Sequence, residues 1–171
     1  MGQSLSKLYV HLVFATKNRY PYITETYEYA LYRYICGIFL NLNSPVLVIN
    51  SMPDHLHILF NLSKNHSLAD VVEEVKKSSS KQMKHEGCKS FTWQPGYAAF
   101  SISQSKVEVV RKYIEDQKEH HKVKTFKKEV KEFMVKYEME NFSEEHFWNN
   151  PKCPNITANL FQPYRLVMAS T

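Results

Sequence analysis

The chain has 171 residues, of which 43% are hydrophobic and 23% are charged, as is ordinary for a soluble globular domain. No apolar run approaches the roughly 18 residues of a membrane span, which excludes an integral membrane protein. The net charge is +5, from 22 Lys and Arg against 17 Asp and Glu. This excess favours an anionic partner, most commonly nucleic acid, although a mildly basic protein without such a partner fits the same value.

The three cysteines are Cys36, Cys88 and Cys153, an odd number at wide spacing. No Cys-x-x-Cys pair occurs, so the sequence indicates neither a disulfide framework nor a zinc ribbon. We therefore expect the protein in the reducing cytoplasm.

The first half of the chain predicts three strands and one helix. Apolar residues alternate over residues 8–14, which predicts a strand, and change to helical spacing over residues 24–42. Residues 46–49 form a continuous apolar run, which predicts a strand buried on both faces. A turn at residues 50–53 leads into a further strand, so the two strands are expected to form a hairpin.

The second half predicts three further helices and one strand. Ser67 begins a helix that ends at Gly87, and an aromatic-rich loop precedes a short strand at residues 98–103. Ser105 and Glu108 resemble a capping box at the start of the next helix. Helical spacing then returns over residues 126–137.

The order β-α-β-β-α-β followed by helix predicts an α+β fold. We expect a ferredoxin-like split βαβ antiparallel sheet with helices on one face, plus a C-terminal helix that carries the candidate nucleophile. The other face is free to host a site or to pair with a second copy. Residues 1–140 are expected to form one domain, and residues 141–171 a tail that docks on it.

The strand at residues 55–60 carries the first candidate site residues. Leu56, Ile58 and Phe60 share one face for the core, and His55 and His57 share the other, where they are expected to face outward. Two imidazoles on a rigid strand form half of a divalent-metal site. A pair of solvated surface histidines is the alternative interpretation of this pattern alone.

The helix from Ser105 carries the residues that are expected to complete this metal site. Tyr113, Gln117 and His121 follow one another at steps of four and share one helix face. The Gln117 carbonyl, added to two histidine nitrogens, suits Mg²⁺ or Mn²⁺, which can polarise a phosphodiester. Tyr113 is then placed as a nucleophile that its surroundings must activate, because a phenol has a pKa of about 10.

Residues 53–57 resemble the His-hydrophobic-His (HUH) motif, and residues 113–117 resemble the nucleophile helix of the insertion-sequence-200-like single-tyrosine transposases. The resemblance covers roughly residues 8–137, with the motifs in the expected order. Three further segments also resemble this family: residues 15–19, 93–97 and 119–121.

The resemblance implies an enzyme that cuts single-stranded DNA at the foot of hairpins. Tyr113 would attack the scissile phosphate and hold the 5′ end, while His55, His57 and Gln117 hold Mg²⁺ or Mn²⁺. His121 is a further candidate at this site. The family works as a homodimer, and in many members each tyrosine helix completes the partner's site. The sequence leaves open whether Tyr113 acts in cis or in trans, and implies a bacterial-type cytoplasmic protein that joins the nucleoid when bound to DNA.

Basic and aromatic residues are candidates for DNA contacts. Trp93 and Tyr97 are expected to pack the dimer or to stack on a base. The basic residues expected on the DNA backbone are Lys17, Arg19, Lys76, Lys77, Lys81 and Lys84.

Three other functions were weighed. A domesticated transposase acting on dispersed palindromic repeats fits the same motifs. A non-catalytic ferredoxin-like nucleic-acid-binding module would expose paired aromatic residues on its central strands, where this chain has His55 and His57. A zinc hydrolase would need a third histidine or cysteine at ligand spacing, and Asp54 is expected on the face opposite the histidines.

Overall fold

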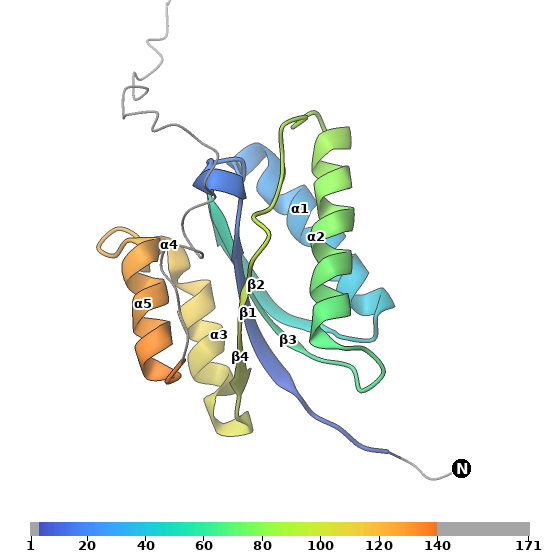
Figure 1. Cartoon of the computed structure of the whole chain (residues 1–171), viewed down its shortest axis with the longest axis vertical. Helices are drawn as coiled ribbons and strands as arrows, with labels where there is room; N and C mark the ends of the chain where they lie inside the picture. The colour runs from blue at the N-terminus through green and yellow to red at the C-terminus, as the bar shows by residue number, and fades with distance from the viewer. Residues whose placement is uncertain (1–3, 140–171) are drawn as a thin grey trace, which may run out of the picture.

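The computed structural model describes residues 4–139 and has a four-stranded antiparallel sheet at its centre. The strand order β2-β3-β1-β4 and the element order β-α-β-β-α-β are those of the predicted ferredoxin-like fold (Figure 1). The strands are β1 (Tyr9–Ala15), β2 (Val46–Met52), β3 (His55–Asn61) and β4 (Ala98–Ile102). The helices are α1 (Glu25–Asn41), α2 (Leu68–His85), α3 (Val107–Glu115), α4 (Gln117–His120) and α5 (Phe126–Lys136).

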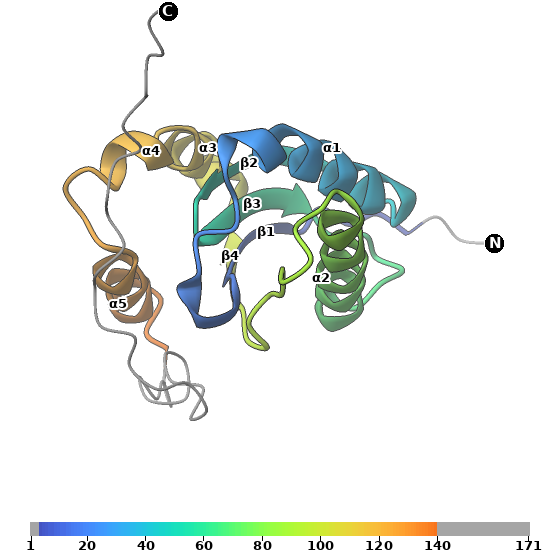
Figure 2. The ribbon, with the colours of Figure 1, turned by 90° about the horizontal axis from the view of Figure 1, so that it is seen from above.

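Helices lie against both faces of the sheet. Helices α1 and α2 cover one face, and α3 and α5 lie on the other side, as both views show (Figures 1 and 2). Two separate clusters of buried apolar residues correspond to these two faces. The face that the sequence left free is therefore covered by the helices that follow β4.

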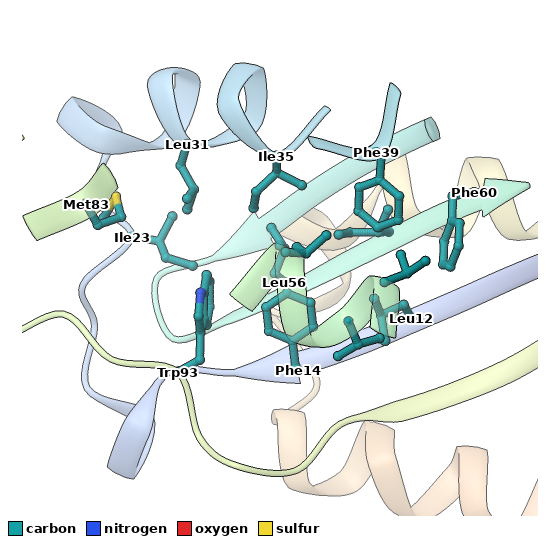
Figure 3. Close-up of a cluster of buried hydrophobic side chains, with 14 of the residues drawn as sticks. Leu12, Phe14, Ile23, Leu31, Ile35, Phe39, Leu56, Phe60, Met83 and Trp93 are labelled. Atoms are coloured by element: carbon teal, nitrogen blue, oxygen red, sulfur yellow. The ribbon is translucent and has the colours of Figure 1, made fainter. Parts of the chain in front are cut away.

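The first cluster packs the sheet against α1 and α2. Leu12 and Phe14 of β1 lie in the same buried cluster as Leu31 and Phe39 of α1 (Figure 3), because alternate strand residues and helix residues about two turns apart face the same space. Trp93 lies in this cluster at 5% exposure, and its indole Nε1 donates to the Ser79 hydroxyl at 2.9 Å. The expectation that Trp93 stacks on a base or packs a dimer is therefore wrong.

Three local predictions differ from the structure. Strand β2 is an edge strand and is mostly half-buried rather than buried on both faces, because its position in the sheet leaves one side unpaired. Ser105 lies in a short 3₁₀ turn, and α3 begins after Lys106 without a side-chain cap, so the predicted capping box does not form. The predicted helix through residues 113–121 is interrupted at Asp116, which separates α3 from α4.

The ends of α2 follow the sequence more closely. The Ser67 hydroxyl accepts a hydrogen bond from the Asp70 backbone N–H at 3.1 Å, as an N-cap does. Gly87 follows the helix at φ +105°, a left-handed conformation that side chains rarely adopt. These two residues fix where the helix begins and ends.

One prediction concerns residues outside the described part of the chain. The docking tail at residues 141–171, which contains Cys153, lies there and stays a prediction. Within residues 4–139, Cys36 and Cys88 are free thiols. None of the described helices is long and apolar enough to span a membrane.

Two leucines of α1 test the packing of the first cluster. Leu31 is 1% exposed and Leu40 is 67% exposed on the same helix. Leu31→Ala should lower the free energy of unfolding by about 2 to 5 kcal/mol, because it removes buried methyl groups and leaves a cavity. Leu40→Ala should change it by less than about 0.5 kcal/mol. Urea unfolding of the two variants measures the difference, and equal losses would contradict the packing.

Candidate metal and nucleophile site

The two histidines of β3 are buried on the sheet face that α3 and α5 cover. His55 is 1% exposed and His57 is fully buried, so the prediction that they face outward is wrong. The alternation itself is confirmed, since Leu56 and Ile58 lie in the cluster on the opposite face. A buried imidazole needs partners for its ring nitrogens, and the partners found here determine which nitrogen remains free.

His55 is oriented by a carboxylate. Its Nδ1 lies 2.7 Å from Asp54 Oδ1, and Asp54 is held in turn by the Arg19 guanidinium, with Nε 2.9 Å from Oδ2. Asp54 lies in the turn before β3, which is why it reaches His55 and does not point away as expected. Burial lowers the pKa of His55 to about 4, against the opposing effect of Asp54. The neutral ring donates from Nδ1 and leaves an Nε2 lone pair.

His57 is oriented by a second histidine. The Nε2 of His11 on β1 lies 3.1 Å from His57 Nδ1, and the two rings stack with centroids 5.3 Å apart. Burial, followed by the proximity of His57, lowers the pKa of His11, which therefore stays neutral and can accept a hydrogen bond. His57 Nε2 is then a buried nitrogen with no hydrogen-bond partner among the described residues.

The tyrosine helix is fixed to the same sheet. The Asn50 side chain of β2 donates to the carbonyls of Ile114 and Glu115 at 2.8 and 2.9 Å, where α3 ends. An ion pair connects α4 to α1, with Lys118 Nζ 2.9 Å from Glu28 Oε2. These contacts hold Tyr113 and Gln117 over the histidines of their own chain.

A buried carboxylate from α5 connects the two halves of the site. The Tyr113 hydroxyl donates to Glu129 Oε1, and Gln117 Nε2 lies 3.1 Å from the same oxygen. Glu129 Oε2 lies 3.2 Å from His121 Nε2 and 3.6 Å from His57 Nε2. Burial would raise the pKa of Glu129, but His121, His57 and Tyr113 together hold it below its ordinary value. Burial and the Glu129 charge raise the pKa of Tyr113.

These side chains fit a divalent metal ion. One donor atom each of His55, His57, His121 and Glu129 lies within 4.8 Å of the others. The separations of His55 Nε2 from His121 Nε2 and from Glu129 Oε2 are 3.2 and 3.9 Å. Donors arranged tetrahedrally at about 2.1 Å from an ion lie about 3.4 Å apart, which is inside this range.

Gln117 is predicted to bind the metal ion through its carbonyl oxygen. Its amide nitrogen faces Glu129, while its Oε1 is buried and has no hydrogen-bond partner among the described residues. A buried carbonyl oxygen without a partner is unusual, and it lies on the same side chain that touches the cluster. Together with His57 Nε2, it is an acceptor that a cation would satisfy.

Two residues of the site, His11 and Glu129, are not predicted from the sequence. His11 alternates with Val10 and Leu12, and only the register of β1 against β3, which pairs Val13 with His57, brings it beside His57. Glu129 had a visible signal: it lies on the apolar stripe of α5 with Phe126, Val130 and Phe133. An acidic residue on a buried helix face requires a polar partner.

Four of the candidate DNA-contacting residues lie on α2, and Lys17 and Arg19 lie in the turn after β1. Lys76 Nζ donates to the carbonyls of Gln94 and Pro95 at 2.6 and 2.8 Å and so holds the aromatic loop, while Arg19 is paired with Asp54. The four other lysines are exposed, and DNA contact by any of the six stays a prediction. They are Lys17, Lys77, Lys81 and Lys84.

Two cavities border the site, and residues of α5 line both. One, of about 380 Å³, is lined by Arg19, His55, His121 and Phe126 among others. The second, of about 170 Å³, is lined by His11, Tyr113 and Phe133 among others. His55 and His121 thus line one cavity, and His11 and Tyr113 line the other.

Comparison with known proteins identifies the family. The sequence pattern described as "Transposase IS200 like" matches residues 4–117. The ISDra2 transposase TnpA of Deinococcus radiodurans is 25% identical over 118 residues, which are 65% of this chain and 84% of that protein.

Two solved structures share the fold. A crystal structure of a transposase from Deinococcus radiodurans has a TM-score of 0.56 at 24% identity, over 68% of this chain and 96% of that one. A REP-associated tyrosine transposase bound to a REP hairpin has a TM-score of 0.54 at 17% identity, over 71% and 74% of the two chains. Because the family pattern covers more than half of the chain, and the antiparallel sheet with its buried histidines agrees with it, the protein belongs to the IS200-like transposases.

Proposed function

We propose that this transposase cuts and rejoins single-stranded DNA through a covalent 5′-phosphotyrosine on Tyr113, with a divalent metal ion at the adjacent histidines. The observation that carries the proposal is the convergence of the Tyr113 hydroxyl and the Nε2 atoms of His55 and His57 on one buried carboxylate, Glu129. A tyrosine beside a set of metal ligands is the arrangement that nucleophilic attack on a phosphodiester requires.

The reaction follows from the chemistry of the phenol. The Tyr113 oxygen forms a bond to phosphorus, and the bond from phosphorus to the 3′ oxygen breaks. The phenol loses its proton and the departing 3′ oxygen gains one, so the charge balances. Since the phosphotyrosine retains a phosphodiester, attack by another 3′ hydroxyl reverses the step and joins new strands without an external energy source.

His55, His57 and Gln117 would hold the metal ion, with His121 as a further ligand. The ion, Mg²⁺ or Mn²⁺, supplies Lewis-acid stabilisation of charge on the phosphate oxygens. The protein orients its own ligands: Asp54 fixes the ring of His55 and His11 fixes that of His57, so both Nε2 lone pairs are directed inward.

The substrate is proposed to be single-stranded DNA that carries a hairpin. The relative of similar fold is described as bound to a REP hairpin, and the net charge of +5 favours a polyanion. The same features fit a domesticated enzyme acting on dispersed palindromic repeats. The buried histidine and carboxylate cluster gives no support to a non-catalytic binding module, which has no use for unpaired acceptors in its core.

A homodimer is proposed, with each active site built from a single chain. Strands β2 and β4 are the two edges of the sheet and offer unpaired backbone groups to a second copy. Tyr113 needs no partner to reach the histidines, because Asn50 anchors α3 to its own sheet and Glu28 anchors the adjoining α4 to α1.

Tyr113→Phe tests the nucleophile. The phenylalanine variant should form no covalent adduct with single-stranded DNA from the flanks of the gene, including its hairpins, because it lacks the attacking oxygen. Its affinity for this DNA should stay within about twofold of the unchanged protein. Denaturing gels detect the adduct, with Tyr29→Phe, an exposed tyrosine of α1, as the control. An adduct with the Tyr113 variant would overturn the assignment.

Metal removal tests the role of the histidines. EDTA should abolish the adduct and added Mn²⁺ should restore it. A bound cation stabilises the negative charge on the phosphate oxygens during the attack. His57→Ala should not recover at a Mn²⁺ concentration that fully restores the unchanged protein. Adduct formation that persists in EDTA would contradict a metal-dependent reaction.

Mixing two inactive variants tests whether one chain makes the whole site. A mixture of Tyr113→Phe and His57→Ala, refolded together so that subunits exchange, should give no adduct, because each site lacks one of its parts. If the tyrosine acted on its partner's histidines, mixed dimers would contain one intact site. Recovery of adduct in the mixture would therefore contradict the single-chain site.

A further inference from the structure

We propose that Glu129 links the metal ion to the nucleophile: one carboxylate oxygen ligates the ion, and the other positions the Tyr113 hydroxyl. This inference rests on the proposed function of the site. Neither His121 nor Glu129 lies within the family pattern, which ends at residue 117. The carboxylate is therefore contributed by a helix that follows the matched part of the chain.

The ligand role follows from the position of Oε2. It lies 3.2, 3.6 and 3.9 Å from the Nε2 atoms of His121, His57 and His55, which are the spacings of donors around a single ion. The Glu129 side chain is 2% exposed, so water can solvate its negative charge only slightly.

The positioning role follows from Oε1. This oxygen accepts from the Tyr113 hydroxyl and lies 3.1 Å from Gln117 Nε2. Because both oxygens belong to one rigid carboxylate, the hydroxyl is held at a fixed place relative to the ion. Side chains that keep a nucleophile in its attacking position contribute to rate without touching the substrate.

The supporting helix holds Glu129 firmly. The Thr125 hydroxyl caps α5 by accepting from the Lys128 backbone N–H, and Phe126, Val130 and Phe133 are buried against the sheet. Phe126 also stacks on His55 with ring centroids 3.9 Å apart. The carboxylate thus belongs to the packed face of α5 and is not a free surface group.

The donor set favours a particular class of ion. Three imidazole nitrogens and one carboxylate oxygen, together with the Gln117 carbonyl, suit a first-row transition ion such as Mn²⁺, whereas Mg²⁺ prefers oxygen ligands and retained water. We therefore expect the chain to bind Mn²⁺ more tightly than Mg²⁺.

Direct metal binding tests the ligand role. Titration of the full chain with Mn²⁺, followed by electron paramagnetic resonance, should show one site per chain. Glu129→Gln, which keeps the shape and removes the charge, should weaken the affinity at least about tenfold. Glu132→Gln is the matched control, since Glu132 lies on the same helix outside the cluster, and it should leave the affinity unchanged. Equal affinity in all three proteins would overturn the ligand role.

The visible spectrum of Co²⁺ gives a readout that depends on ligand identity. Co²⁺ bound to the unchanged protein should show the absorption of a nitrogen- and oxygen-ligated ion, and Glu129→Gln should shift it. Glu129→Asp, which retains a carboxylate, should keep part of the Mn²⁺ affinity. Circular dichroism shows whether each variant is folded, and if Glu129→Gln is not, the Asp variant and the Co²⁺ spectrum of the unchanged protein decide.

Adduct formation at saturating Mn²⁺ tests the positioning role. Glu129→Gln should attach to DNA at least about tenfold more slowly in a single turnover, at unchanged DNA affinity. A full rate at saturating Mn²⁺ would overturn this role, and a faster rate would show that the carboxylate only occupies the place of the scissile phosphate. If the unchanged protein forms no adduct but Glu129→Gln still loses Mn²⁺, the proposed function fails and the ligand assignment stands.

Discussion

The site depends on the burial of two imidazoles on the central strand β3. Four ring nitrogens of His55 and His57 are removed from water, and each would cost free energy if left unsatisfied. Asp54 and His11 satisfy the two Nδ1 atoms, which fixes both rings and their tautomers. The Nε2 atoms of both histidines face the same space. The groups that contact these two atoms must therefore come from the helices that follow β4.

The strand β3 and the division of its residues between two faces were predictable because the signal is local. Alternation over β3 separates Leu56, Ile58 and Phe60 from the histidines whatever the rest of the chain does. The steps of four from Tyr113 to Gln117 likewise place two groups on one helix face without tertiary information, and the interruption at Asp116 leaves that relation intact. The order of strands and helices then restricts the topology to few arrangements.

The burial of the site was not predictable by the same reasoning. Alternation says which residues share a face but not what covers that face, so His55 and His57 were expected in solvent. The histidines are covered only when α5 packs against this face of the sheet, which depends on tertiary structure. The local indication of this packing is Glu129, an acidic residue on the apolar stripe of α5. His11 shows the same limit, since its contact with His57 depends on the pairing of β1 with β3.

Helix α5 has two opposite effects on the same site. It supplies the carboxylate that joins Tyr113 to the histidines, and it forms a wall of both cavities, so that Tyr113 lines one and His55 the other. In the proposed reaction a DNA phosphate would contact Tyr113 and the histidines together, whereas Tyr113 and His55 line different cavities. Phe126 lines one of these cavities and Phe133 the other, so the packing of α5 that holds Glu129 at the site also bounds the space that a substrate would enter. On the proposed function, the helix that completes the site therefore also limits access to it, and it follows the part of the chain that the family pattern matches.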